Sequence, residues 1–136
     1  MAYNLLKGKR GIIFGALNDS SIAWKVAERC HEEGAQLVLT NTPVACRMGT
    51  IDELAEKTGS IVIAADATSV EDLEMLFVEA QKALGGKIDF VLHSVGMSPN
   101  VRKNIPYESL DYNNFTKTID ISALSFHKLL QVLYAK

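Results

Sequence analysis

The segment from Arg10 to Trp24 has the residue types of a strand-to-helix turn that binds phosphate. A short apolar run, 11–14, is typical of a buried parallel strand, and Gly15 follows it where the backbone must turn sharply. Polar residues then lead into a helix that Ser20 or Ser21 is expected to cap. Because free N–H groups and the helix dipole attract anions at such a helix start, the segment predicts a phosphate site.

The glycine pattern of this turn is weak evidence by itself. Dinucleotide-binding turns typically carry three glycines in the order G-x-G-x-x-G, and only Gly15 remains of them here. An ordinary strand-to-helix turn without a ligand therefore explains these residues as well as a phosphate site does.

Strands and helices that could position this turn alternate along the chain. The expected strands are 11–14, 36–40, 60–64 and 89–93, and the expected helices are 21–33, 44–58, 68–84 and a long run over 111–135. Residues 100–109 are expected to form a polar loop. This alternation predicts an α/β fold, a doubly wound parallel sheet with right-handed crossovers.

Capping signals and apolar spacing refine the helices. Thr42 is expected to cap the second helix with Pro43 at its first position, although Gly49 weakens the first half of that helix. Thr68 and Glu71 have the spacing of a capping box for the third. The first helix is expected to bury the stripe Ile22, Val26 and Cys30, and the last run, capped by Asp111, has the apolar residues Phe115, Ile119, Leu129, Leu130 and Leu133.

Composition limits the class of protein. The 136 residues are 48% hydrophobic, which suits one globular domain, and the formal net charge of −2 favours neither nucleic acid nor an anionic membrane as partner. No apolar run has the length of a membrane span or a secretory signal. The isolated thiols Cys30 and Cys46 fit a reducing compartment, and the pair Cys30-His31 lacks the spacing of a metal site. We expect a cytoplasmic protein without a metal.

Polar or small residues follow each of the four expected strands. They are Gly15 and Ser21-Ile22 after the first strand, Asn41-Thr42 after the second, Asp66-Ala67 after the third and His93-Ser94-Val95-Gly96 after the fourth. In a doubly wound sheet, ligands bind beyond the carboxyl ends of the strands, where all of these residues would lie. Their coincidence favours a binding site over four unrelated loops.

Three motifs together resemble the bacterial enoyl-acyl-carrier-protein reductases, a divergent branch of the short-chain dehydrogenase/reductase family. They are Gly15 followed after five residues by Ser21-Ile22-Ala23-Trp24, the pair Asp66-Ala67, and the stretch His93-Ser94-Val95-Gly96-Met97-Ser98-Pro99. The resemblance implies a Rossmann-type sheet with helices on both faces. It also implies that 1–136 is the N-terminal part of a single dinucleotide-binding domain, ending before the fifth strand.

The resemblance implies a role for each of these positions. Gly15, Ser21 and Ile22 would bind the cofactor pyrophosphate, and Asp66 and Ala67 would frame the adenine. His93 and Ser94 would shape the cofactor pocket without proton chemistry, and Val95 and Gly96 would lie beside the nicotinamide ribose. Ser98 would meet the acyl substrate.

The cofactor is expected to be NADH, because the family most often uses it. Thr42 stands where the family often has glutamine, and neither Asn41 nor Thr42 repels a 2′-phosphate as an acidic residue would. No lysine or arginine lies directly beside them, and Arg47 falls further into the next helix. NADPH therefore stays open as an alternative.

The activity implied by the resemblance is NADH-dependent reduction of the trans-2 double bond of enoyl thioesters on acyl carrier protein. The catalytic tyrosine and lysine of the family are expected beyond Lys136, so residues 1–136 alone are not expected to turn over. The long last helix is expected to pair with a neighbouring subunit of a homotetramer. The alternatives are a nucleotide-binding module without catalysis and a different short-chain dehydrogenase/reductase.

Overall fold

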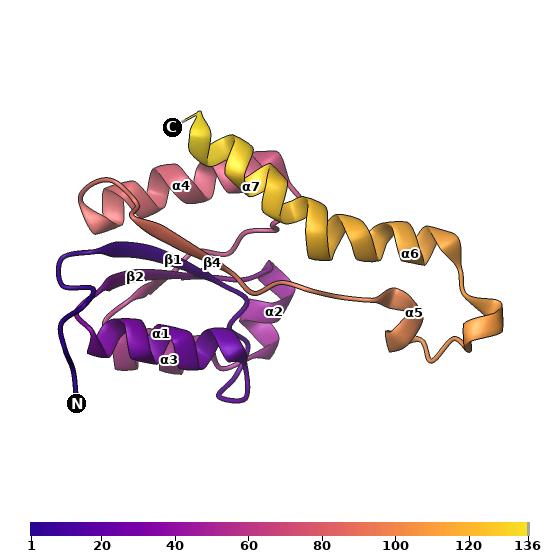
Figure 1. Cartoon of the computed structure of the whole chain (residues 1–136), viewed down its shortest axis with the longest axis horizontal. Coiled ribbons are helices and arrows are strands. Elements are labelled where there is room, and N and C mark those ends of the chain that lie inside the picture. Colours follow the sequence, from indigo (N-terminus) through magenta and orange to yellow (C-terminus); the bar gives the residue numbers. More distant parts are fainter. Residues whose placement is uncertain (136) are drawn as a thin grey trace.

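A four-stranded parallel sheet forms the centre of the protein, in a computed structural model that describes residues 1–135 (Figure 1). The strands lie in the order β3-β2-β1-β4 and are β1 (Arg10–Phe14), β2 (Gln36–Thr40), β3 (Ile61–Val62) and β4 (Phe90–His93). Since β4 lies on the opposite side of β1 from β2, the strand order reverses between β1 and β4. The predicted Rossmann-type α/β fold is confirmed.

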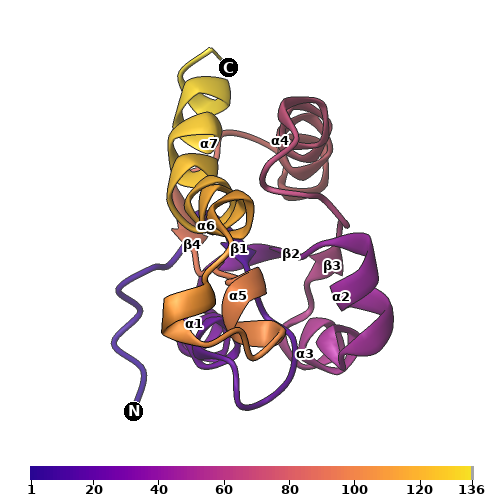
Figure 2. The ribbon, with the colours of Figure 1, turned by 90° about the vertical axis from the view of Figure 1, so that its right-hand side faces the viewer.

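Helices cover both faces of the sheet. They are α1 (Ile22–Glu32), α2 (Pro43–Met48), α3 (Ile51–Thr58), α4 (Val70–Leu84), α5 (Pro99–Arg102), α6 (Tyr112–Ile119) and α7 (Ser125–Tyr134). A 3-10 turn, η1 (Tyr107–Ser109), precedes α6, and a π-helical segment, η2 (Asp120–Leu124), joins α6 to α7. Figure 2 shows α1 and α3 on one side of the sheet and α4 and α7 on the other.

The alternation of side chains along the strands divides the core into two layers. In β1, Ile12 and Phe14 pack with the buried residues of α4 and α7, whereas Ile13 faces α1 and α3. Because each strand has helices on both faces, its apolar run is continuous. The four expected strands are therefore present, although β3 is shorter than expected and pairs with β2 only at Ile61 and Val62.

The buried face of α1 differs from the expected stripe. Ala23, Trp24 and Ala27 are buried, while Ile22 is 75% exposed and Cys30 is half-buried. Alanines let the helix axis approach the sheet closely, so the small side chains face inward. The expectation of a buried Ile22 is wrong.

Helix starts agree with the sequence in some places and differ in others. Thr42 caps α2 by accepting from Ala45 N at 3.2 Å, as expected, but the predicted helix over 44–58 is divided into α2 and α3 at Gly49. The cap of α4 is Ser69, whose hydroxyl accepts from Asp72 N at 3.2 Å. The expected capping box from Thr68 to Glu71 is therefore wrong: the cap lies one residue later, and the Asp72 carboxylate accepts from Asp66 N and not from Ser69 N.

The segment expected as a polar loop is folded against α6. It contains the short helix α5, and Asn100 is buried: its side chain donates to Asp111 O at 3.0 Å and accepts from Asp111 N at 3.2 Å. Asp111 caps α6 as expected by accepting from the N–H groups of Asn113 and Asn114. Among residues 1–135, no helix is long and apolar enough to cross a membrane.

Candidate functional site

The turn after β1 lies directly against the loop after β4. Gly15 has a φ of 99°, which side chains rarely tolerate, and a Cβ atom there would overlap the carbonyl oxygen of Ser94. Gly15 N also donates to Thr40 O, at the end of β2, at 3.1 Å. Gly15 therefore lets three strand ends meet at the point where the strand order reverses.

The start of α1 leaves backbone donors free. The Ser21 hydroxyl accepts from Leu17 N at 3.0 Å and Asn18 N at 3.1 Å, so it shapes the turn and does not cap the first helical turn as expected. Among the described residues, no side chain caps α1, and its first turn contains no acidic residue. These N–H groups and the helix dipole fit the phosphates of a dinucleotide.

The loop after β2 is held to the first turn. Asn41 donates from Nδ2 to Ala16 O at 3.0 Å and accepts from Thr42 N at 2.9 Å. The Thr42 hydroxyl is the cap acceptor of α2. Asn41 thereby places Thr42 beside the turn that carries Gly15.

The loop after β3 is fixed by its own aspartates. Asp66 accepts on Oδ1 from Thr68 N at 2.8 Å and from the Thr68 hydroxyl at 2.7 Å, while its backbone N–H donates to Asp72 Oδ2 at 2.8 Å. Ala67 is buried in the layer that contains α4 and α7. Within residues 1–135, Oδ2 of Asp66 has no hydrogen-bond partner, so it can accept from a ligand amino group.

The loop after β4 begins with a half-buried histidine. Because the Ser125 hydroxyl donates to Ile121 O at 2.6 Å, its oxygen accepts from His93 Nε2 at 2.8 Å. The ring also meets Phe126 edge to face, with 5.5 Å between ring centroids. Burial lowers the pKa of His93 below its ordinary value of 6.5, which favours the neutral ring and fits a structural role.

The remaining predicted residues follow His93. Val95 packs against the layer of α4 and α7, and Gly96 is exposed, with space around it. Ser98 caps α5 by accepting from Val101 N at 3.5 Å. Figure 1 shows α5 and α6 extending beyond the carboxyl ends of the strands.

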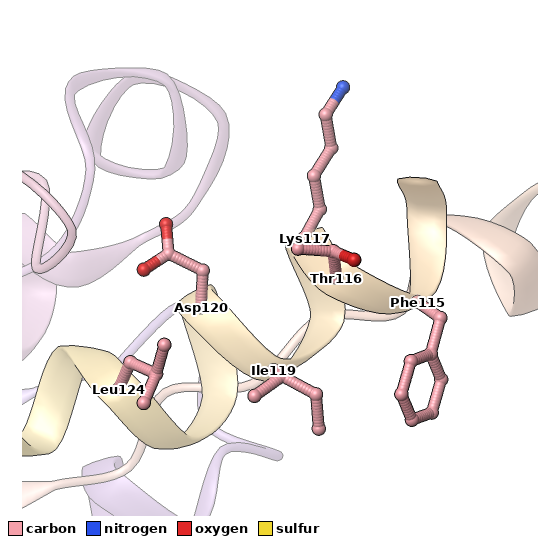
Figure 3. Close-up of a pocket in the computed structure, with 6 residues that line it drawn as sticks. All are labelled: Phe115, Thr116, Lys117, Ile119, Asp120 and Leu124. Carbon is pink, nitrogen blue, oxygen red and sulfur yellow. The ribbon is translucent and has the colours of Figure 1, made fainter. Parts of the chain in front are cut away.

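All of the predicted cofactor residues thus lie at the carboxyl edge of the sheet, where Gly15 contacts Ser94. A separate open hollow of about 420 Å³ lies on α6 and η2 and contains none of them. Figure 3 shows that its lining includes Phe115, Ile119 and Leu124.

Three polar residues of η2 and α7 also reach this edge and were missed. Ser122 contacts Met97, Ser125 contacts His93, and Lys128 donates to Thr68 O at 3.1 Å. The available signal was their spacing of three residues within the last helical run, which makes successive members neighbours on the helix surface.

The fold is that of a Rossmann-type α/β protein, and the strand ends have the arrangement expected of a dinucleotide site. The family model described as enoyl-(acyl carrier protein) reductase matches residues 15–135. The chain belongs to this family.

Individual relatives agree with that assignment. The chain is 65% identical to the FabI–NADH complex from Alistipes finegoldii, a crystal structure, with a TM-score of 0.95 over 98% of this chain and 47% of that one. It is 35% identical to enoyl-[acyl-carrier-protein] reductase [NADH] 1 of Rhizobium meliloti (strain 1021), over 92% of this chain and 46% of that protein. It is 32% identical to the FabI enzyme of Escherichia coli (strain K12), over 89% and 46%.

The chain spans about half the length of the curated relatives it matches. The catalytic tyrosine and lysine expected beyond Lys136 lie outside the described residues. Residues 1–135 therefore include the predicted cofactor-binding residues and Ser98, which is expected to meet substrate.

Proposed function

We propose that the protein is an NADH-dependent enoyl-acyl-carrier-protein reductase and that residues 1–136 are the N-terminal part of its single Rossmann-fold domain. The observation that carries the proposal is the meeting of Gly15 with Ser94 beside the uncapped start of α1, where the strand order reverses. Membership of the reductase family and the similarity to a FabI–NADH complex support the choice of reaction.

The predicted residues each fit one part of the cofactor. The free backbone N–H group of Ile22 would bind the pyrophosphate, and the exposed Ile22 side chain would be covered by it. Ser21 would contribute by shaping the turn, since its own N–H donates to Asn18 O at 2.9 Å. Asp66 Oδ2 would accept from the adenine amino group, with Ala67 forming the wall beneath. Ser94, Val95 and Gly96 would lie along the nicotinamide ribose.

Bound NADH would supply a hydride to the β-carbon of the enoyl thioester. The chain's own contribution is to hold the cofactor at fixed strand ends and to present the Met97-Ser98 backbone to the acyl group. Such fixed orientation is a large part of the rate advantage of an enzyme.

The preference for NADH over NADPH is supported by the loop after β2. The Thr42 hydroxyl is engaged as a helix cap, and Arg47 lies at the far end of α2. A 2′-phosphate would therefore lack a cationic partner in this loop, although nothing acidic would repel it. We expect tighter binding of NADH, measured as a ratio of dissociation constants.

The test uses the protein expressed from its complete reading frame. NADH oxidation is followed with a crotonyl thioester of acyl carrier protein and, in parallel, with a saturated butyryl thioester that cannot be reduced. Turnover of crotonyl thioester alone supports the proposal. NADH binding without turnover would instead favour a nucleotide-binding module, the alternative function.

We propose a cytoplasmic homotetramer as the working assembly. Exposed apolar side chains on α6, η2 and α7, among them Phe115, Ile119, Leu124 and Leu130, support burial against another subunit. The half-buried thiols Cys30 and Cys46 are both unpaired, which supports a reducing compartment.

A further inference from the structure

The helical run after Asp111 is not α-helical throughout. Five residues, Asp120–Leu124, are π-helical, between the α-helical segments α6 and α7. Single π-helical turns are uncommon and are frequent at functional sites, because they turn side chains to directions that a regular helix does not offer.

The first contact made by this region is with the loop after β4. The Ser122 hydroxyl accepts from Met97 N at 3.1 Å and donates to Met97 O at 3.4 Å, which one hydroxyl can do at once. Three residues later, Ser125 accepts from His93. The two serines therefore fix both ends of the segment 93–97, which holds Ser94, Val95 and Gly96.

The second contact is with the loop after β3. Lys128 donates from Nζ to Thr68 O at 3.1 Å and pairs with Asp120 Oδ1 at 2.8 Å. Asp120 belongs to η2, so the π-helical segment also orients the lysine. Thr68 directly follows Asp66 and Ala67, whose loop is thereby tied to α7.

We propose that the face of η2 and α7 carrying Ser122, Ser125 and Lys128 is a clamp on the two cofactor loops. In it, Ser122 positions the nicotinamide and substrate end, and Lys128 positions the adenine end. This inference rests on the proposed function, which assigns the cofactor to these loops. Because Ser122 and Lys128 act through backbone groups of Met97 and Thr68, they are positioning residues.

The two ends of the clamp give separable outcomes. K128M keeps the aliphatic stem but removes the charge, so the dissociation constant of NADH is expected to rise about threefold to tenfold. S122A is expected to raise KM for the crotonyl thioester by a similar factor and to raise the NADH dissociation constant less than K128M does. S122T and K128R, which keep the hydroxyl and the charge, are expected to restore most of each loss.

A matched control separates the clamp from surface charge. Lys82 pairs with Glu79 at the same 2.8 Å, but it lies on the outer side of α4 and has no backbone carbonyl partner among the described residues. K82M is therefore expected to leave both constants unchanged. Isolated exposed ion pairs contribute little, so an effect of K128M beyond that of K82M comes from the contact with Thr68 or from the less exposed pair with Asp120. Hydrogen exchange over 66–68 then identifies the loop contact.

The experiment is titration of the protein from its complete reading frame with NADH, followed by initial-rate measurements and hydrogen exchange of the loop amides. Exchange at Met97 should accelerate in S122A, and exchange over 66–68 should accelerate in K128M. Equal NADH affinity in K128M and K82M, or an unchanged KM in S122A, would overturn the clamp. If wild-type protein binds no NADH, the proposed function fails, and the exchange rates still decide whether the clamp exists.

Discussion

At the scale of single residues, the lack of a Cβ atom at Gly15 affects both the fold and the proposed cofactor site. G15A would place a Cβ against the Ser94 carbonyl at a φ of 99°, so the loops after β1 and β4 must separate. We expect NADH affinity to fall by at least about tenfold, with a loss of stability on the order of 1–3 kcal/mol. Calorimetric titration and thermal unfolding measure the two effects.

The matched control is G59A. Gly59 also has a positive φ, 61°, but a Cβ there meets nothing within 4 Å, so only the backbone strain is introduced. That strain is roughly 1–2 kcal/mol for a residue with a side chain. G59A should lower the unfolding temperature and keep NADH affinity, and equal losses of affinity in both variants would refute the contact argument.

His93 predicts a pH dependence of stability. Its pKa is lowered by burial, so near pH 6 the unfolded chain binds more protons than the folded one. The free energy of unfolding should therefore fall as the pH drops from about 7 through the folded pKa. H93Q, which keeps an N–H donor for Ser125 but does not titrate, should flatten this slope in urea unfolding curves. A slope that persists in H93Q would assign the pH dependence to other groups.

The sequence located most of the candidate site residues at the carboxyl edge of the sheet because their signals are local. A glycine after an apolar run marks Gly15, and small residues after strands mark Ala67 and Gly96. The direction of the Ser21 hydroxyl could not be predicted, because Leu17 and Asn18 reach it only after the turn has closed. Exposure of Ile22 likewise follows from which face of α1 meets the sheet.

At the scale of elements, the start of α4 has two neighbouring residues that could each cap the helix. Thr68 and Ser69 are both cap residues by type, but Thr68 donates its hydroxyl to Asp66, which leaves Ser69 as the cap. S69A should lower stability by about 1 kcal/mol. E71Q should change it little, since Glu71 accepts only from the exposed Ser69 hydroxyl; chemical denaturation measures both.

The elements that the sequence located well are those with continuous apolar runs or long apolar stripes. β1, β2, β4, α1 and α4 agree within about two residues. The division at Gly49 and the π-helical turn of η2 were missed for different physical reasons. Gly49 lies against Leu17 O, a contact between distant segments, and Ser122 of η2 bonds to Met97, which is also distant in the sequence. Both features involve tertiary contacts that local sequence signals do not report.

At the scale of the whole molecule, the helical layers on the two faces of the sheet contribute differently to the candidate site. The layer of α1 and α3 closes one side with buried apolar residues, and the uncapped start of α1 lies at the edge that we propose binds the cofactor. The layer of α4 and α7 closes the other side and also holds the loops after β3 and β4. The candidate site is therefore assembled from segments far apart in the sequence. Its individual residues can be predicted from the sequence for this reason, but the distances between them cannot.

The same long helix leads to a prediction about assembly. Phe115, Ile119 and Leu124 line the hollow on α6 and η2, and they stay exposed although each is large and apolar (Figure 3). If this face packs against a second copy, a charge there is buried without a partner, which strongly opposes association. I119E, in the protein from its complete reading frame, should shift the mass measured by light scattering to a smaller species. The matched variant M75E, on α4, changes a side chain that is 42% exposed compared with 41% for Ile119, and it should leave the mass unchanged. Retention of the wild-type mass by I119E would show that this face does not join subunits.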